Sequence, residues 1–461
     1  MATIQCISPV DSSIYVERET ADAGAIQQAL DVAANAQRNW KNTPVAERQA
    51  LCTRVVDAFV ANRDEIAKEL TWQMGRPISQ APGEVAGFEE RARYMIDIAE
   101  SALAPVQPEP KEGFTRYIKR EPLGVVFVIA PWNFPYLTSV NAIMPALLAG
   151  NSVLLKHSAQ TPLCAERLQQ AFDEAGLPQG VFQHLHLTHA DTETVIRSPQ
   201  VDFVAFTGSV PGGEMVERTA VGRFIGVGLE LGGKDPAYVR ADAELQHAIE
   251  TVTDGAIFNS GQSCCGIERV YVDAAVYDDF IAGVTELVNS YRLGRPDEAD
   301  TNLGPLVKAA AADFARGQVD DAVAAGATAL IDPARFDADA KGSPYLAPQV
   351  LVDVDHSMRV MTEETFGPVI PVMKVSGDDE AIGLMNDSEF GLTAAIFTQD
   401  EAAAVAIGDR VDTGTWFMNR CDYLDPALAW TGVKNSGRGC TLSSVGFEHL
   451  TRPKSYHLKR V

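Results

Sequence analysis

Apolar side chains in the first hundred residues recur at the three- and four-residue spacing of amphipathic helices. The pattern predicts helices over 25–39 and 44–62, and it continues over 63–73. The texture changes at Leu123, because 124–130 is a continuous apolar run, which is typical of a strand buried on both faces. The amino-terminal part is therefore predicted to be mainly helical, and a sheet is expected to begin with that run.

Short apolar runs then alternate with helical patterns to about residue 433. Strands are predicted at 152–156, 181–185, 202–206 and 268–272, and helices at 136–149, 162–175, 243–258, 276–291 and 310–326. Such alternation is typical of parallel sheets covered by helices, so the predicted fold class is α/β. Two alternating blocks predict two α/β domains with a boundary near 232–233. The Pro-rich segment 105–122 lies outside both blocks and is expected to form a protruding hairpin.

Composition and charge narrow the class of partner. The chain has 461 residues, enough for two or three domains, and its 46% hydrophobic and 22% charged residues are typical of a globular protein. Its 62 acidic and 38 basic residues give a formal charge of −24. An acidic surface repels phosphate backbones and anionic lipids, so neither nucleic acid nor a membrane is an expected partner.

The amino terminus and the cysteines bear on location. Residues 1–15 have neither a basic stretch nor an apolar core, so no signal peptide is expected, and apolar runs such as 142–149 are too short to span a bilayer. The seven cysteines are an odd number without metal-like spacing, and only Cys264 and Cys265 are adjacent. These features predict a soluble cytoplasmic protein without a metal site.

No GxxxxGK[ST] or GxGxxG loop is present to bind a phosphate. The run 226–232 is similar to the second pattern, but it has one residue too many and precedes no predicted helix. The stretch 206–213, Phe-Thr-Gly-Ser-Val-Pro-Gly-Gly, follows a predicted strand and opens a predicted helix, whose first N–H groups could face a pyrophosphate. An ordinary strand-to-helix turn would have the same character, and both interpretations stay open at this point.

Three further segments carry residues able to do chemistry. Cys264, in Gly-Gln-Ser-Cys-Cys-Gly (261–266), lies between a predicted helix and a predicted strand, where a thiolate could attack a carbonyl carbon. Glu230 lies between two leucines and before two glycines, and partial burial there would raise its pKa and make it a general base. Asn133, in Pro-Trp-Asn-Phe-Pro, follows the strand ending at Ala130 and could direct its amide at an oxyanion. Taken alone, each could instead be structural: a buried cysteine, a surface glutamate or a proline-fixed turn.

Together these segments resemble the aldehyde dehydrogenase superfamily, and the resemblance runs essentially from end to end. Its motifs are Pro-Trp-Asn-Phe-Pro (131–135), Lys156 with Gln160-Thr-Pro, Phe-Thr-Gly-Ser (206–209), Leu-Glu-Leu-Gly-Gly-Lys (229–234), Gly-Gln-Ser-Cys (261–264), Glu-Glu-Thr-Phe-Gly-Pro (363–368) and Asn386-Asp-Ser with Gly391-Leu. Each is weak alone, but seven in the family's order and spacing make a specific signal. The implied fold has a Rossmann-type cofactor domain, an α/β catalytic domain and a small bridging element.

The resemblance implies oxidation of a small-molecule aldehyde to the carboxylic acid with NAD or NADP. Cys264 would form a thiohemiacetal, the side-chain amide of Asn133 would stabilise its oxyanion, and Glu230 would activate the water that hydrolyses the thioester. The residues implied to bind the cofactor are Ile129, Trp132, Lys156, Gly208, Ser209, Leu231, Glu364 and Phe366.

A domain division follows from the same resemblance. The cofactor-binding domain comprises 1–104 and 123–233, and the catalytic domain comprises 234–447. A bridging element, used in a homodimer or homotetramer, comprises 105–122 and 448–461.

Two departures from the family pattern bear on the cofactor and on proton transfer. Relatives restricted to NAD often have a Glu three residues after the ribose-binding lysine, where it repels a 2′-phosphate; here the position is Ala159, so NADP is not excluded. The neighbouring His157 could even favour the phosphate. Some relatives carry a Lys–Glu pair behind the general base, but the matching positions are Ala142 and Thr441. Glu230 is therefore expected to exchange protons through water or backbone.

The sequence leaves the identity of the aldehyde open. Residues expected to line a substrate tunnel are Tyr136, Asn141, Phe258, Asp422 and Trp430. Asp422 with nearby aromatic rings would suit a cationic aminoaldehyde, whereas Arg420, if it points inward, would suit the carboxylate of a semialdehyde. Both could also be satisfied by other groups at the surface.

Two other functions compete with aldehyde oxidation to the acid. A CoA-acylating dehydrogenase would have no use for a base at Glu230. A non-catalytic relative would have no use for the intact set of Cys264, Glu230, Asn133 and Lys156. Both alternatives are therefore disfavoured by the residues present.

Overall fold

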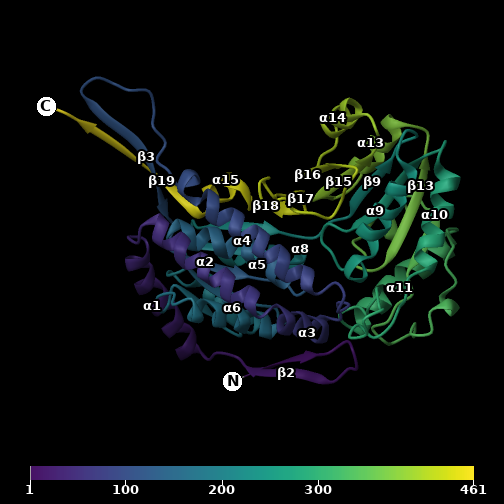
Figure 1. Cartoon of the computed structure of the whole chain (residues 1–461), viewed down its shortest axis with the longest axis horizontal. Coiled ribbons are helices and arrows are strands. Elements are labelled where there is room, and N and C mark those ends of the chain that lie inside the picture. Colours follow the sequence, from purple (N-terminus) through teal and green to yellow (C-terminus); the bar gives the residue numbers. More distant parts are fainter. Residues whose placement is uncertain (1) are drawn as a thin grey trace.

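Two mainly parallel sheets organise the chain, which a computed structural model describes over residues 2–461 (Figure 1). Six strands form the first sheet in the order β18-β8-β7-β4-β5-β6, and seven form the second in the order β11-β12-β13-β10-β9-β15-β16. The α/β class predicted from the alternation of patterns is confirmed.

The first sheet has the reversing strand order of a doubly wound fold. Its strands are β4 (Val125–Ile129), β5 (Ser152–Lys156), β6 (Phe182–His184), β7 (Phe203–Thr207), β8 (Gly226–Glu230) and β18 (Gly437–Arg438). β4 is central, with β5 and β6 parallel to it on one side and β7 and β8 on the other. β18 closes the edge antiparallel to β8. In such sheets ligands bind beyond the carboxyl ends of the strands, where the order reverses.

Helices connect the strands of this sheet and cover it. They are α5 (Pro135–Ala149), α6 (Pro162–Glu174), α7 (His189–Arg197) and α8 (Val210–Ala220). The strand predicted at 152–156 is confirmed to the residue, and the helices predicted at 136–149 and 162–175 agree within one residue. The central strand is apolar throughout because it is buried at every position.

The amino-terminal helices are present, and they are preceded by a pair of strands that the hydrophobic pattern does not predict. The helices are α1 (Ala23–Trp40), α2 (Val45–Ala61), α3 (Arg63–Met74) and α4 (Pro82–Ala102). β1 (Thr3–Ile7) and β2 (Ile14–Glu19) pair antiparallel before α1. Most of their side chains are at least partly exposed, so they show no buried face from which a strand could be inferred.

The second sheet follows the same strand–helix alternation. Its strands are β9 (Asp235–Val239), β10 (Ile267–Asp273), β11 (Thr328–Ala329), β12 (Gln349–Val352), β13 (Val369–Val375), β15 (Thr393–Phe397) and β16 (Thr415–Met418). Its main helices are α9 (Leu245–Ile257), α10 (Tyr277–Asn289), α11 (Ala309–Ala324), α13 (Asp378–Asn386) and α14 (Glu401–Gly408). The helices predicted at 243–258, 276–291 and 310–326 agree with α9, α10 and α11 within two residues.

A two-stranded sheet projects from the body of the molecule (Figure 1). Its strands, β3 (Phe114–Pro122) and β19 (Thr451–Lys459), pair antiparallel along their whole length. The predicted hairpin within 105–122 is wrong for most of that segment, because β3 takes its partner from the end of the chain. Within the segment itself, Val106 and Ile118 form an isolated bridge.

Short elements complete the chain. They are β14 (Phe390–Gly391), β17 (Val433–Lys434), α12 (Arg359–Thr362), α15 (Ser443–Gly446) and the 3-10 turns η1 (Phe258–Gly261), η2 (Pro333–Arg335) and η3 (Glu448–Leu450). Over residues 2–461, no helix combines the length and apolar character needed to cross a membrane. The same residues contain no group of three or more His, Cys, Asp and Glu side chains placed to hold a metal ion.

Candidate active site

Four strands of the first sheet end at one edge and bring candidate residues together. The register pairs Ile129 of β4 with Lys156 of β5 and with Phe206 of β7. It also pairs Thr207 of β7 with Glu230 of β8. Because parallel strands point the same way, these five residues share the carboxyl edge through backbone register alone.

Glu230 ends β8 with its carboxylate inside the protein. Thr441 Oγ1 donates to one oxygen at 2.6 Å, and Thr207 Oγ1 donates to the other at 3.2 Å. Burial raises the pKa of the Glu230 carboxyl, although the two hydroxyls and the charge of Arg91 oppose the rise. A carboxylate with a raised pKa is suited to take a proton near neutral pH.

The positions that hold a Lys–Glu pair in some relatives lie close to Glu230 here. Thr441 contacts Glu230 directly, and both residues line a small cavity of about 30 Å³ together with Ala142. A space of this size beside a carboxylate and threonine hydroxyls can hold a water molecule. This arrangement is compatible with proton exchange through water.

The turn before Cys264 is held in an unusual conformation. Asn259, Ser260 and Gly261 have φ angles of 54°, 58° and 73°, which is left-handed backbone at three successive positions. Such conformations cost about 1–3 kcal/mol for each non-glycine residue and persist where their surroundings hold them. Asn259 Nδ2 donates to the Gln262 carbonyl at 3.2 Å, and the Ser260 hydroxyl donates to a backbone carbonyl at 2.9 Å. These side chains therefore fix the direction in which Cys264 leaves the turn.

The two adjacent cysteines have different environments. Both line the same large cavity, but Cys264 is partly exposed whereas Cys265 is buried. The Cys265 thiol donates to the Asp422 carboxylate at 2.9 Å, and the neighbouring Cys264, burial and Asp422 hold the pKa of Cys265 well above its usual value. A protonated, enclosed thiol is a poor nucleophile, so this geometry favours Cys264.

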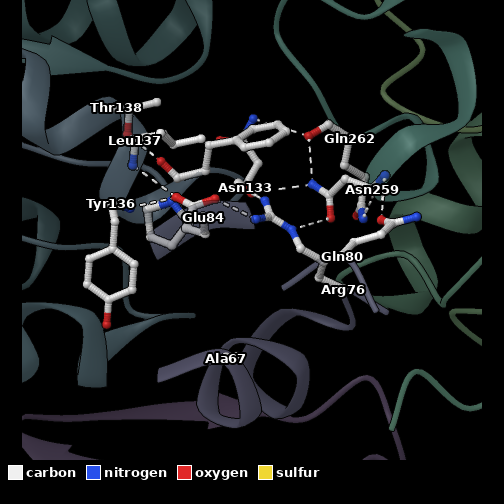
Figure 2. Close-up of polar contacts among 12 residues, drawn as sticks. Ala67, Arg76, Gln80, Glu84, Asn133, Tyr136, Leu137, Thr138, Asn259 and Gln262 are labelled. Atoms are coloured by element: carbon white, nitrogen blue, oxygen red, sulfur yellow. Dashed lines mark hydrogen bonds and ion pairs between the residues drawn. The ribbon is translucent and has the colours of Figure 1, made fainter. Parts of the chain in front are cut away.

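A buried network holds Asn133 beside the cysteine turn (Figure 2). Arg76 and Glu84 form an ion pair whose side chains are 1% and 0% exposed. Arg76 also donates to the carbonyl of Asn133 and, through Nε, to Asn259 Oδ1 at 3.2 Å. The Asn133 amide donates to the Gln262 carbonyl at 3.2 Å. The Asn133 amide is thereby tied to the same turn that positions the cysteine.

Glu84 also caps the helix that follows Asn133. Its Oε1 accepts from the backbone N–H groups of Tyr136 and Leu137, both at 2.9 Å (Figure 2). Free N–H groups at a helix start favour a negative partner. One carboxylate therefore sets both the first turn of α5 and, through Arg76, the backbone of Asn133 two residues before it.

Sequence reasoning did not identify two charged residues of α4, Glu84 and Arg91, although the sequence carries a signal for both. Glu84 and Arg91 fall on the buried face of α4, in line with Phe88 and Met95. Charged residues at buried positions of a helical period are uncommon without a partner or a function. A search for such positions would have singled out both.

A cavity of about 620 Å³ opens in front of Cys264 and Glu230. Four residues expected in a substrate tunnel line it: Asn141, Phe258, Asp422 and Trp430. Tyr136 does not, because it is 1% exposed and packs edge-on against Phe59 of α2, with 4.8 Å between ring centroids. The expectation for Tyr136 is therefore wrong: α5 turns this side chain into the core.

The two charged residues of the 420–424 loop also differ. Asp422 Oδ1 accepts from Ser263 Oγ at 3.0 Å as well as from Cys265, and burial raises the pKa of Asp422 to about 6. Arg420 is exposed, lies over the Tyr423 ring at 3.6 Å and does not line the cavity. Arg420 is therefore not placed to meet a substrate carboxylate there.

The strand edge has the chemistry of a dinucleotide site. Lys156 is 9% exposed, and burial lowers its pKa with no hydrogen bond from residues 2–461 to offset the shift. Ser209 caps α8 by accepting from the Gly212 N–H at 3.4 Å, so this helix begins at the same edge. A buried cation without a partner and a helix amino terminus both favour phosphate and ribose oxygens. The residues present therefore fit NAD(P).

Glu364 lies against the glycines that follow Glu230. Its Oε1 accepts from the Gly233 N–H at 3.0 Å, and a Cβ at Gly232 would lie only 2.3 Å from the same oxygen. Burial and the nearby Glu268 raise the pKa of Glu364 to about 7. Only glycine at position 232 lets this carboxylate approach the strand edge.

Phe366 is held next to Glu364 by a buried ion pair. Glu268 accepts from the Phe366 N–H at 2.8 Å and pairs with Lys234 at 2.7 Å. Phe366 itself has a φ of 54°, and its ring meets Trp132 edge-on at 5.8 Å between centroids. Two of the residues implied to bind the cofactor are thereby in contact.

His157 has a structural role beside Lys156. It is 3% exposed, its Nε2 lies 3.3 Å from the Pro135 carbonyl, and its Nδ1 accepts from the Ser158 N–H at 2.9 Å. Burial lowers the pKa of His157 to about 3, so the ring is neutral. The suggestion that His157 attracts a 2′-phosphate is therefore wrong.

Comparison with known proteins agrees with this geometry. The model of the aldehyde dehydrogenase family matches residues 1–456, and the chain belongs to that family. It is 36% identical over 433 residues to a Deinococcus radiodurans protein named succinate-semialdehyde dehydrogenase (NADP+), a match covering 94% of this chain and 90% of the relative. The chain is an oxidoreductase of the class that oxidises aldehydes with NAD(P)+.

Solved structures of the same family have the same fold. An NADP-dependent glyceraldehyde-3-phosphate dehydrogenase from Bacillus halodurans, complexed with NADP, superposes with a TM-score of 0.93 at 32% identity over 100% of this chain and 96% of that one. A succinic semialdehyde dehydrogenase from Streptococcus pyogenes, in complex with NADP+, superposes with a TM-score of 0.94 at 27% identity over 99% and 100%.

Proposed function

We propose that Cys264 is the nucleophile and Glu230 the general base of this aldehyde oxidation. The observation that carries the proposal is that both residues line one cavity, with Cys264 accessible and Cys265 enclosed. The raised pKa of Glu230 supports its role as the base.

The reaction begins when the Cys264 thiol loses its proton to a water molecule and its sulfur bonds to the aldehyde carbon. The carbonyl oxygen becomes an oxyanion, which the Asn133 side-chain amide and the Cys264 N–H stabilise. Bound NAD(P)+ supplies the acceptor for the hydride that leaves this carbon, and a thioester on Cys264 remains. Glu230 then takes a proton from a water molecule as the water oxygen attacks the thioester carbon. The carbon–sulfur bond breaks, the carboxylic acid is released, and the proton passes from Glu230 to the Cys264 sulfur.

The cofactor is proposed to lie along the strand edge. Lys156 would bind the adenosine ribose, Ser209 and Gly208 at the start of α8 the pyrophosphate, and Glu364 the nicotinamide ribose. Four further residues would complete the contact surface: Ile129, Trp132, Leu231 and Phe366. Ala159 is exposed and carries no charge to repel a 2′-phosphate, which supports use of NADP+ as well as NAD+.

The domain division, the oligomer and the location are proposed on separate grounds. We assign 1–104 with 123–233 to the cofactor-binding domain and 234–447 to the catalytic domain. The sheet of β3 and β19 would bridge subunits of a homodimer or homotetramer, since an isolated two-stranded sheet gains stability when it is covered. All seven cysteines are free thiols, which suits a reducing cytoplasm.

The experiment that tests the proposed function measures both products of the reaction. Purified protein is incubated with a panel of aldehydes and with NAD+ or NADP+, in the presence and absence of CoA. We expect NAD(P)H and the free carboxylic acid in equal amounts, independent of CoA. Formation of acyl-CoA as the sole product would contradict the role of Glu230 in hydrolysis.

A further inference from the structure

The substrate cavity contains a cation that has no ionic partner in the protein. Arg91, on α4, lines the cavity together with Cys264 and Glu230, yet only 7% of its surface is exposed. It donates through Nη1 to the Leu137 carbonyl at 2.6 Å and to Asn141 Oδ1 at 3.3 Å. Within residues 2–461 no carboxylate lies within ion-pair distance of it, and burial lowers its pKa.

Five carboxylates also line the cavity: Glu84, Glu230 and Asp422 are engaged inside the protein, whereas Glu90 and Asp254 are exposed to solvent. Glu84 pairs with Arg76, the only other cation lining the cavity among the residues described, and Asp422 accepts from Ser263 and Cys265. Glu230 accepts from two threonines. Among the described residues, Arg91 is therefore the buried cation of the cavity that has no ion-pair partner.

Asn141 adds a second donor beside this guanidinium. Asn141 lines the cavity and is 1% exposed. Its Nδ2 is buried and has no hydrogen-bond partner among the described residues. Because its Oδ1 faces Arg91 Nη1 at 3.3 Å, the side-chain amide is oriented by the arginine. An unsatisfied buried donor costs about 1–3 kcal/mol, which is recovered when a ligand oxygen accepts from it.

We propose that Arg91 and Asn141 together bind the carboxylate of an aldehyde substrate that carries an anionic tail. The inference rests on the proposed function and names the substrate class for the same cavity. A guanidinium binds a carboxylate through two parallel hydrogen bonds, and the amide donor of Asn141 supplies a further one. The preference for an acid tail arises because a neutral tail would leave both groups desolvated and without a partner.

The test compares two aldehydes of equal length, succinate semialdehyde (4-oxobutanoate) and butanal. For the wild type we expect a kcat/KM for the anionic aldehyde about 100-fold above that for butanal. R91Q should reduce this ratio to near one, chiefly by raising KM for the anionic aldehyde, while R91K should keep part of it. N141L should lower the ratio by about tenfold, because one hydrogen bond to the carboxylate is lost.

Arg420 provides the matched control, since it is also a cation near the cavity but is exposed and stacked on Tyr423. R420Q should leave the ratio within a factor of two of the wild type. If R91Q does not fold, the ratios of R91K and N141L decide the matter. Equal losses with both aldehydes in the Arg91 variants would show a structural role and overturn the proposal.

The wild type separates the two levels of inference. Oxidation of butanal without any preference for the anionic aldehyde would overturn the role of Arg91 and Asn141 and leave the proposed function standing. Failure to oxidise any aldehyde with either cofactor would overturn the proposed function itself, and the carboxylate site with it.

Discussion

At the carboxyl edge of the first sheet, Lys156 and Glu230 end regular strands whose register brings them together. In the turn before Cys264, by contrast, three successive residues have left-handed backbone and depend on side chains from distant segments. Arg76 reaches this turn from a position 183 residues earlier in the chain. Both regions contribute residues to the same candidate active site. Backbone register positions the first region, whereas hydrogen bonds from distant side chains position the second.

The difference separates sites that can be changed without unfolding from sites that cannot. A residue at a strand end can lose its side chain while the backbone ladder remains intact. A residue in the network of Arg76, Glu84 and Asn133 is both a contact for the active site and a buried support. We therefore expect substitutions at the strand edge to affect activity alone, and substitutions in the network to affect activity and stability together.

The largest expected effect concerns Cys264, the residue that the left-handed turn of residues 259–261 positions. C264A should lower kcat for aldehyde-dependent NAD(P)H formation by about 10⁴-fold or more, because the nucleophile is removed. C265A, the matched control on the adjacent residue, should retain activity within about tenfold, since its buried thiol contacts Ser263 and Asp422 and has no part in the bond to the aldehyde. Activity is followed by NAD(P)H absorbance and cofactor binding by fluorescence. Comparable activity in C264A and the wild type would contradict the assignment.

The next effect tests the strand edge. E230Q should lower the steady-state rate by about 10³-fold while leaving a rapid burst of one NAD(P)H per active site, because the thioester forms but is hydrolysed slowly. The free energy of unfolding should be almost unchanged. Stopped-flow absorbance measures the burst and chemical denaturation the stability; loss of the burst would place Glu230 before the thioester.

The raised pKa of Glu230 also predicts a pH profile. The carboxylate must be deprotonated to accept a proton from water, so kcat should fall as pH decreases through that raised value. E230Q should lack this acid limb. An unchanged limb in E230Q would assign it to another group.

A smaller effect on stability distinguishes the buried network of Arg76, Glu84 and Asn133 from the carboxyl edge of the first sheet. E84Q leaves Arg76 buried without a charge partner, so the free energy of unfolding should fall by about 3–5 kcal/mol, with a lower kcat. E193Q is the control, because it breaks the exposed pair with Arg197 and should cost less than about 1 kcal/mol. The measurement is urea denaturation of each variant. Equal stability losses in E84Q and E193Q would remove the distinction between the two regions.

The smallest effect concerns cofactor choice at the strand edge. A159E places a carboxylate three residues after Lys156, so it should raise KM for NADP+ by about tenfold through repulsion of the 2′-phosphate. KM for NAD+ should change less, and stability should be unaffected because the position is exposed. Parallel kinetics with both cofactors test this, and an equal change for NAD+ and NADP+ would contradict it.

Local pattern predicted most of the sheet-and-helix framework. The strand at 152–156 and helices such as α5 and α6 were predictable because burial on one or both faces leaves a periodic apolar signature. The pair β1 and β2 was not, since its side chains are largely exposed. Strand β3 was expected in a hairpin, but its partner lies more than 300 residues away, and no local pattern specifies such a pairing.

The sequence by itself determined the α/β class, the family and the identity of Cys264, Glu230 and Asn133 as candidates, because short motifs carry local backbone and chemical requirements. Only the tertiary structure decided that Tyr136 lies in the core, that His157 is buried and neutral, and that Arg91 is the unpaired cation of the cavity. The physical reason is that burial, charge pairing and hydrogen-bond satisfaction depend on groups distant in sequence. Those quantities exist only once the elements have packed.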